Sequence, residues 1–254
     1  MNLLDTARHV EASRAMGAQA WRMAAGRLGD PVPACPDWRV RDVVHHLGNV
    51  ASYVHACVDH GPGQPEFIDA EMPTDDRVIQ WAAGEWDRVL DRLAAADPRA
   101  AAWNWSVQPH VVSFWPRCLT HEVFVHSWDI ADAAGEPLAV PADVAADGVD
   151  EILAVHLPAG VRDGRRFTRA GRIDVHSTDT GHRWLVELTT ATAHTRAAAP
   201  GEPNEPGEPN EPSDTRIAAT AEELYLDLWG RTPLNLNPHQ RHWAGQLAAG
   251  TPTV

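Results

Sequence analysis

The sequence predicts an α+β protein with two domains, a helical amino-terminal domain over residues 1–158 and a smaller mixed α/β domain over residues 159–254. The first half of the chain repeats apolar residues at the helical spacing of three and four. From Arg165 onward the pattern changes to the alternation of apolar and polar residues that strands show. At 254 residues the chain is long enough for two modest domains, each with its own buried core.

Three helices are expected before residue 100. Residues 3–27 carry apolar positions at helical spacing without proline, and the Gly- and Pro-rich stretch 29–36 ends that pattern. Residues 40–54 then place valine, leucine and alanine on one continuous apolar face. A third such face spans residues 78–93 and follows a loop rich in glycine and proline at 61–73.

Two further helices complete the first half. One is expected from about Phe114 to Ala134, where it contains the chain's most informative motif, His121-Glu-Val-Phe-Val-His-Ser-Trp-Asp129. The other is expected from Ala142 to His156, because it begins after a proline and a second proline, Pro158, follows it.

The second half predicts a β-hairpin. Residues 172–178 and 182–189 alternate apolar with polar side chains across the turn Asp179-Thr-Gly181. A short strand is expected at 215–220, followed by a helix at 221–230 that ends at glycine.

A repeated Gly-Glu-Pro-Asn-Glu-Pro unit interrupts this domain near residues 199–213. Such a sequence cannot bury a core, so we expect a disordered, solvated loop there without a catalytic role.

The charge balance excludes some functions. The formal net charge is −14, and no basic stripe is visible along which a nucleic-acid backbone could bind. The amino terminus lacks the pattern of a secretion signal, and no stretch approaches the ~20 apolar residues of a membrane span. Three cysteines at unrelated spacings, Cys35, Cys57 and Cys118, form no disulfide framework. We therefore expect a soluble, cytoplasmic protein that binds neither nucleic acid nor membrane.

Glu122 and His126 are the central candidate residues. They lie four residues apart, so both side chains leave the same face of a helix. The neighbouring residues Leu119, Val123 and Ile130 indicate that this face points inward, where such groups are costly to bury unless they are paired or metal-bound. Spacing alone leaves open whether they form two metal ligands, a buried ion pair or a contact on the helix surface.

His46, on the apolar helix at 40–54, is the candidate third ligand, although a lone histidine there is also typical of a core or boundary residue. Two histidines and one carboxylate would leave an open coordination position. Asp129 could orient His126 or could be a solvated carboxylate. His121 lies five residues before His126, so the zinc-protease pattern His-Glu-x-x-His does not apply and His121 is expected to be peripheral.

Other common catalytic signatures are missing. The sequence contains no Gly-rich phosphate loop, no Gly-x-Ser-x-Gly elbow and no Cys-x-x-Cys pair. The metal triad is therefore the constellation on which a functional hypothesis can rest.

Two segments carry a family resemblance. Residues 33–48, Pro-Ala-Cys-Pro-Asp-Trp-Arg-Val-Arg-Asp-Val-Val-His-His-Leu-Gly, and residues 121–129 resemble the mycothiol-dependent maleylpyruvate isomerase family. The resemblance implies a DinB-like four-helix bundle at the amino terminus. Residues 172–188 and 226–233 look like the family's carboxy-terminal domain, which is similar to sterol-carrier-type α/β folds.

The resemblance also implies a site. In that family a divalent metal, usually zinc, is held by residues that correspond here to His46, Glu122 and His126. The arginine of the Trp-Gly-Arg motif, here Arg231, is implied to hold the thiol cofactor or an anionic substrate at the domain interface, although a structural role is equally consistent with the sequence. His45 should point about 100° away from His46 on the helix and is not expected to be a ligand. The chain departs from the family pattern in the Gly-Glu-Pro-Asn repeat and at Arg39, where a small hydroxyl residue commonly caps the second helix.

These expectations combine into one function. We expect a metal-dependent, mycothiol-using enzyme in which His46, Glu122, His126 and Arg231 are catalytic and the metal presents the thiol as a thiolate to an electrophilic small molecule. The outcome would be thiol S-transfer or cis–trans isomerisation of the maleylpyruvate type, and the breadth of the family favours the transferase. The protein would act as a monomer or small homo-oligomer. The alternatives are a thiol-independent metal hydrolase and a non-enzymatic protein that binds a small molecule.

Overall fold

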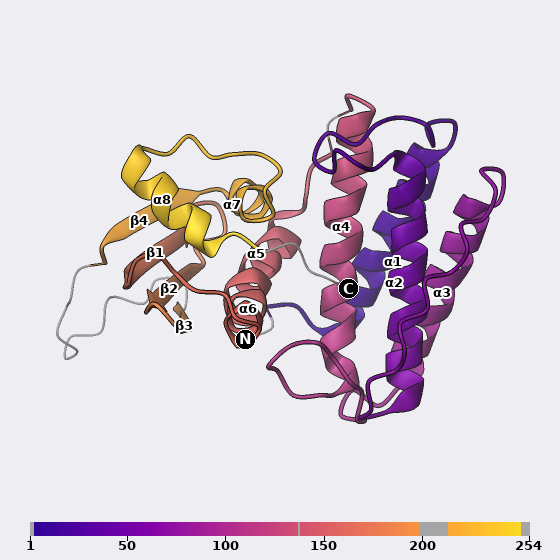
Figure 1. The fold of residues 1–254 in the computed structure, drawn as a ribbon, viewed down its shortest axis with the longest axis horizontal. Coiled ribbons are helices and arrows are strands. Elements are labelled where there is room, and N and C mark those ends of the chain that lie inside the picture. Colours follow the sequence, from indigo (N-terminus) through magenta and orange to yellow (C-terminus); the bar gives the residue numbers. More distant parts are fainter. Residues whose placement is uncertain (1–2, 137, 199–212, 250–254) are drawn as a thin grey trace. The chain divides into compact units, whose positions relative to one another are not determined.

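The computed structural model describes residues 3–136, 138–198 and 213–249 (Figure 1). As predicted, the fold is α+β, with helices in the first half and a four-stranded sheet with helices in the second. The described residues divide into two compact units, one from residue 5 to 139 and one from residue 140 onward that also contains Leu3 and Leu4. We call these the helical unit and the sheet unit.

The helical unit is a bundle of four long helices, which lie side by side in Figure 1. In the bundle α1 packs against α3 and α4, and α2 packs against the same two helices. The helices predicted in this region are confirmed, and the second extends nearly two turns beyond residue 54, to His60, before the C-cap Gly61. Their bounds are α1 (Thr6–Ala24), α2 (Val40–His60), α3 (Val78–Ala95) and α4 (Trp115–Ala133), the last entered through a short 3-10 turn, η1 (Val112–Phe114).

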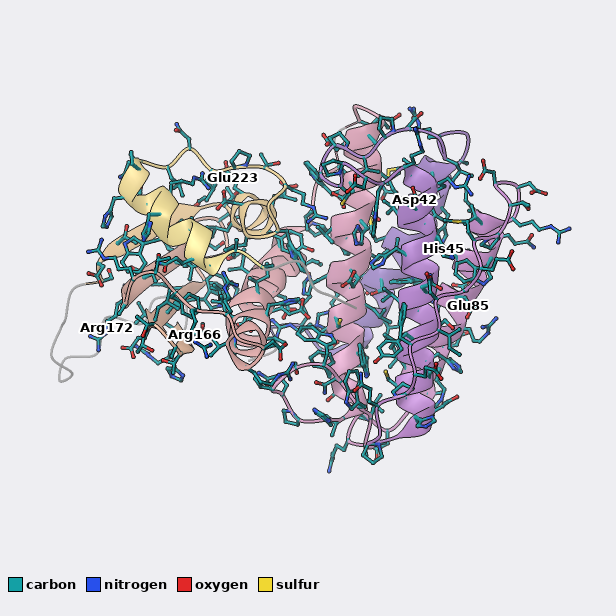
Figure 2. The ribbon with its side chains drawn as sticks, viewed as in Figure 1. Asp42, His45, Glu85, Arg166, Arg172 and Glu223 are labelled. Carbon is teal, nitrogen blue, oxygen red and sulfur yellow. The ribbon has the colours of Figure 1, made fainter. Side chains whose placement is uncertain are left out.

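Helix α2 begins at Val40, as the sequence predicts, although Arg39 precedes it in place of the small hydroxyl residue that commonly caps this helix. The backbone N–H of Arg39 donates to the carboxylate of Asp42 at 2.8 Å, so an acidic residue in the first turn stabilises the helix start (Figure 2). Two turns further along, Gly48 allows the ring of Trp81 on α3 to approach closely, since a Cβ atom there would lie 2.2 Å from the ring. These contacts fix the helix that carries His46.

Helix α4 is buried along most of its length, from Trp115 to Ile130. A helix buried on all sides does not have a solvent face on which polar side chains can lie. Glu122, His126 and Asp129 are therefore interior groups, and the surface i,i+4 contact is excluded for the first two.

The sheet unit is built around one mixed sheet with strand order β3-β2-β1-β4. The predicted hairpin is confirmed: β1 and β2 pair antiparallel with Ile173 opposite Val186. The predicted strand at 215–220 is β4, which runs parallel to β1. The bounds are β1 (Gly171–Ser177), β2 (Arg183–Leu188), β3 (Ala193–Ala198) and β4 (Thr215–Ala219).

Helices complete the sheet unit. The predicted helix after β4 is α7, and Thr220 and Glu223 exchange hydrogen bonds across its first turn (Figure 2). Helix α8 was not predicted, and neither was β3. The helices are α5 (Ala142–Glu151), the π turn η2 (Ile152–His156), α6 (Leu157–Arg162), α7 (Ala221–Leu228) and α8 (Pro238–Leu247).

The prediction of a helix end near Pro158 was wrong. The chain continues from α5 through the π turn η2 into α6, and Pro158 lies at the start of α6. A π turn widens the helix locally, so it accommodates a proline that lacks a backbone N–H and would clash within a regular helix.

These helices pack with the sheet. The indole N–H of Trp184 donates to Asp150 at 2.9 Å, and the hydroxyl of Thr195 donates to the carbonyl of Leu153 at 2.7 Å. The compact sheet unit accordingly starts at Val140, whereas the predicted domain boundary lies at 158–159.

Two further expectations concern membranes and the repeat. None of the helices in the described part of the chain has the length and apolar character that spanning a bilayer requires. The predicted disordered loop near 199–213 falls almost wholly on residues 199–212, which lie outside the described residues.

Candidate metal centre

The structure brings together three predicted ligands within the helical unit. Helix α2 supplies His46, and adjacent turns of α4 supply Glu122 and His126. One ligand atom from each residue lies within 4.8 Å of the other two. Among the described residues this is the group of histidine, cysteine and acidic side chains that could hold a metal ion.

The separations fit ligands of a shared ion. Oε2 of Glu122 lies 3.6 Å from Nε2 of His46 and 3.6 Å from Nε2 of His126. A tetrahedral zinc ion with bonds of about 2.1 Å holds its donor atoms about 3.4 Å apart. A hydrogen bond between imidazole and carboxylate needs a separation of about 2.7–3.2 Å. Both separations are longer than a hydrogen bond and within the range of an ion pair, so the geometry fits ligands of a shared ion as well as the buried ion pair that spacing left open.

Asp129 orients one of the imidazoles. Its Oδ2 lies 2.9 Å from Nδ1 of His126, and its side chain is fully buried, which excludes the solvated carboxylate that the sequence also allowed. A carboxylate can only accept, so the proton of the neutral imidazole belongs on Nδ1. Nε2 then presents its lone pair toward Glu122, as metal coordination requires.

One side of the site is more open than the others. The side chain of His46 is 25% exposed, compared with 9% for Glu122 and 10% for His126. His46 is therefore the most exposed of the three candidate ligands.

Trp38 is an element of the site that the sequence analysis did not single out. Its ring lies 5.1 Å from that of His46 and 6.0 Å from that of His126, centroid to centroid. The only available signal was its place in the segment 33–48, directly before the helix that carries His46.

The neighbouring histidines have other surroundings. His45 points to a different side of α2, where Nε2 lies 2.8 Å from the carbonyl oxygen of Ala70 and the ring lies 5.3 Å from that of Trp81 (Figure 2). His121 is buried and meets the ring of His9 edge to face at 6.2 Å. Neither belongs to the group of ligand atoms, in agreement with the predicted exclusion of both.

The cysteines do not join the site. Cys57 is buried in α2, and burial raises the pKa of its thiol to about 12, so it stays protonated at neutral pH. Cys118 is buried one turn before Glu122 on α4 but is not in the group of ligand atoms.

Arg231 belongs to the sheet unit. It follows the glycine that ends α7, Gly230, whose φ of +73° makes the chain turn there. Its guanidinium donates from Nη1 to the carbonyl of Trp229 at 2.7 Å. Its role in holding a thiol or an anionic substrate stays a prediction.

Comparison with known proteins places this site in a family context. Residues 9–131 match the family model described as the mycothiol maleylpyruvate isomerase N-terminal domain. Two crystal structures are similar to the chain, one of the mycothiol-dependent maleylpyruvate isomerase and one of a mutant of it in which alanine replaces a histidine. Each aligns with a TM-score of 0.56 at 12% sequence identity over 91% of both chains, which shows a shared fold. No curated protein sequence matches the chain.

Proposed function

Because residues 9–131 match the model of the mycothiol maleylpyruvate isomerase N-terminal domain, we propose that this chain is a metal-dependent enzyme that uses mycothiol. The observation that carries the proposal is the convergence of His46, Glu122 and His126 within 4.8 Å inside that domain. Its substrates would be the low-molecular-weight thiol and an electrophilic small molecule.

The donor set suits the proposed chemistry. A divalent metal on these three ligands, zinc by preference, would lower the pKa of a thiol enough to supply a thiolate at neutral pH. Glu122 contributes a negative charge from a site that is nearly closed to water, and Asp129 keeps the His126 proton away from the ligand nitrogen. Three protein ligands leave a further position for the thiol, which would enter on the more exposed side at His46.

The same addition can lead to two products. When a thiol adds to an activated double bond, a C–S bond forms and the π electrons move to the neighbouring carbonyl group. Rotation followed by reversal of these changes would isomerise the substrate, whereas proton uptake at carbon would give a stable thioether. The breadth of the family favours the second outcome, a thiol S-transferase, as the main activity.

Arg231 is the proposed anion-binding residue. A guanidinium presents a planar fork of donors that pairs with a carboxylate in two parallel hydrogen bonds. The substitution Arg231→Lys would keep the charge and remove the fork, so we expect KM for an anionic substrate or for the thiol to rise more than kcat falls.

The decisive experiment begins with metal content. Protein purified without added metal would be assayed by elemental analysis, together with His46→Ala and His45→Ala as a matched pair from adjacent positions. We expect the wild type and His45→Ala to bind one equivalent of divalent metal and His46→Ala to lose it, since His45 bonds to Ala70 outside the ligand group.

The second stage tests the thiol. Metal-loaded protein would be incubated with mycothiol and a panel of electrophiles, and conjugation and cis–trans isomerisation would be monitored. The proposal fails if neither exceeds the background of metal alone. Activity that persists without thiol and disappears in Glu122→Ala would indicate a hydrolase instead, and a wild-type protein without bound metal would indicate a non-enzymatic binding protein.

A further inference from the structure

Trp38 contacts both histidines of the metal centre, although these belong to different helices. Its ring is tilted by 51° against His46 of α2 and nearly parallel, at 28°, to His126 of α4. The two imidazoles meet each other edge to face, with centroids 4.9 Å apart and planes at 75°. One indole is thus a neighbour of both candidate ligand rings.

The backbone on either side of this indole is fixed. The N–H of Trp38 donates to the carbonyl of Cys35 at 2.8 Å, and its own carbonyl accepts from Val32 at 3.0 Å. Just beyond it, Val40 donates to Asp30 at 3.0 Å, which ties the start of α2 to the same loop. These bonds fix the backbone from which the indole extends, independently of the two histidines.

We infer that Trp38 is a positioning residue of the metal centre, which holds His46 and His126 in the orientation that binds the ion. This inference rests on the metal site of the proposed function. An imidazole that is free to rotate loses conformational entropy when it coordinates, and a ring that is already held loses less. The carboxylate of Asp129 fixes His126 from the Nδ1 side, and the ring of Trp38 lies nearly parallel to the same imidazole.

The aromatic character of Trp38 contributes a second effect. Coordination to a dication makes an imidazole more positive, and the face of an indole is the negative part of its quadrupole. The nearly parallel stack on His126 therefore favours the metal-bound form over the metal-free form. A side chain of similar bulk without a π system would supply packing but not this attraction.

A purely structural role makes a different prediction. If Trp38 served only as packing, its replacement would lower the free energy of unfolding and leave the metal affinity unchanged. The helical unit offers a matched control in Trp21, which is also half-buried and meets the ring of Trp86 at 6.4 Å, outside the metal-ligand group.

The test measures zinc affinity by competition with a chromophoric chelator in the full-length protein. The wild type would be compared with Trp38→Leu, Trp38→Phe and Trp21→Leu, with circular dichroism as the check on folding. We expect Trp38→Leu to weaken zinc binding about tenfold, in the range typical of residues that support metal ligands. We expect Trp38→Phe to stay close to the wild-type affinity, and Trp21→Leu to lose stability without a change in affinity.

Cobalt gives an independent readout of geometry. The visible absorption of bound Co²⁺ should change in intensity in Trp38→Leu and remain as in the wild type in Trp21→Leu, because d–d intensity reports the symmetry of the ligand set. Equal zinc affinity in Trp38→Leu and the wild type would overturn the inference and leave the proposed function intact. A wild type that binds no zinc or cobalt would overturn both.

Discussion

Buried carboxylates meet their partners at different distances in the two units. In the sheet unit, Asp174 accepts two hydrogen bonds from Arg183 at 2.8 and 2.9 Å, and Asp227 accepts one from Arg241 at 2.7 Å. In the helical unit, Glu122 lies 3.6 Å from each of two imidazole nitrogens. The first arrangement is direct hydrogen bonding, whereas the second has separations close to those between the ligands of a shared ion.

This difference in distance indicates different roles for the buried carboxylates of the two units. A paired carboxylate and guanidinium offset each other's loss of hydration, so that removal of one partner leaves an unpaired charge and destabilises the fold. A carboxylate that also serves as a metal ligand contributes to metal binding as well as to the fold. Substitution of Asp174 should therefore change stability, and substitution of Glu122 should change metal affinity.

The largest effect is expected from Glu122→Gln. This change removes the negative ligand and keeps the shape, so zinc affinity should fall about a hundredfold or more, beyond the loss typical for supporting residues. The stability of the metal-free protein should not fall, because an interior charge is removed. Chelator competition and urea unfolding in EDTA would measure the two quantities. A metal-free variant that is markedly less stable than the wild type would show that Glu122 is a structural ion-pair partner.

In contrast to Glu122→Gln, Asp174→Asn should lower stability without a change in zinc affinity. Asp174 is buried and its hydrogen bonds hold the pKa of Arg183 above its ordinary value. Because the arginine is partly exposed, we expect a loss of about 2 kcal/mol in the free energy of unfolding, less than for a fully buried pair. Zinc affinity should not change. A double-mutant cycle with Arg183→Gln would isolate the pair, and a coupling energy near zero would contradict this assignment.

Asp129→Asn tests a carboxylate that combines both roles, because it is hydrogen-bonded and its partner is a candidate metal ligand. Asp129 is paired at hydrogen-bonding distance, like the sheet carboxylates, yet its partner His126 is a metal ligand. Asparagine still accepts from Nδ1 but lacks the charge that makes the imidazole a stronger ligand, so zinc affinity should fall about tenfold. Chelator competition measures it, and an unchanged affinity together with a loss of stability would place Asp129 among the purely structural carboxylates.

The sequence predicted the helical unit better than the sheet unit for a physical reason. A helix repeats its geometry locally, so the apolar face of residues 40–54 and the i,i+4 relation of Glu122 to His126 follow from spacing alone. Strand β3 depends on pairing with β2, and its Ala-His-Thr-Arg-Ala-Ala sequence has little apolar alternation to reveal it. Helix α8 did carry a local signal that was overlooked, the capping residue Asn237 followed by proline.

Within the site, the features hardest to predict from the sequence are contacts between segments that are far apart in the chain. The approach of His46 to Glu122 was a hypothesis from two apolar helix faces, which the family resemblance supported, because no local pattern relates α2 to α4. Trp38 was missed because a tryptophan before a helix has no distinctive spacing, and its role follows only from the two rings that it contacts. The π turn before Pro158 was likewise invisible, since proline normally indicates a helix end.

The smallest effect concerns acid stability in the sheet unit. Burial tends to raise the pKa of Asp179, but hydrogen bonds from the Ser177 hydroxyl and from the backbone N–H groups of Ala221 and Thr180 outweigh it, so the pKa lies below its ordinary value. A lowered pKa in the folded state stabilises the protein above the unfolded value of about 4 and loses this contribution as pH falls through the folded value. Since Asp179 is exposed, Asp179→Asn should cost less than about 1 kcal/mol at pH 7. Urea unfolding at pH 7 and at pH 3 should show that the difference from the wild type shrinks in acid, and a difference that grows in acid would mean that the hydrogen bonds favour the protonated carboxyl.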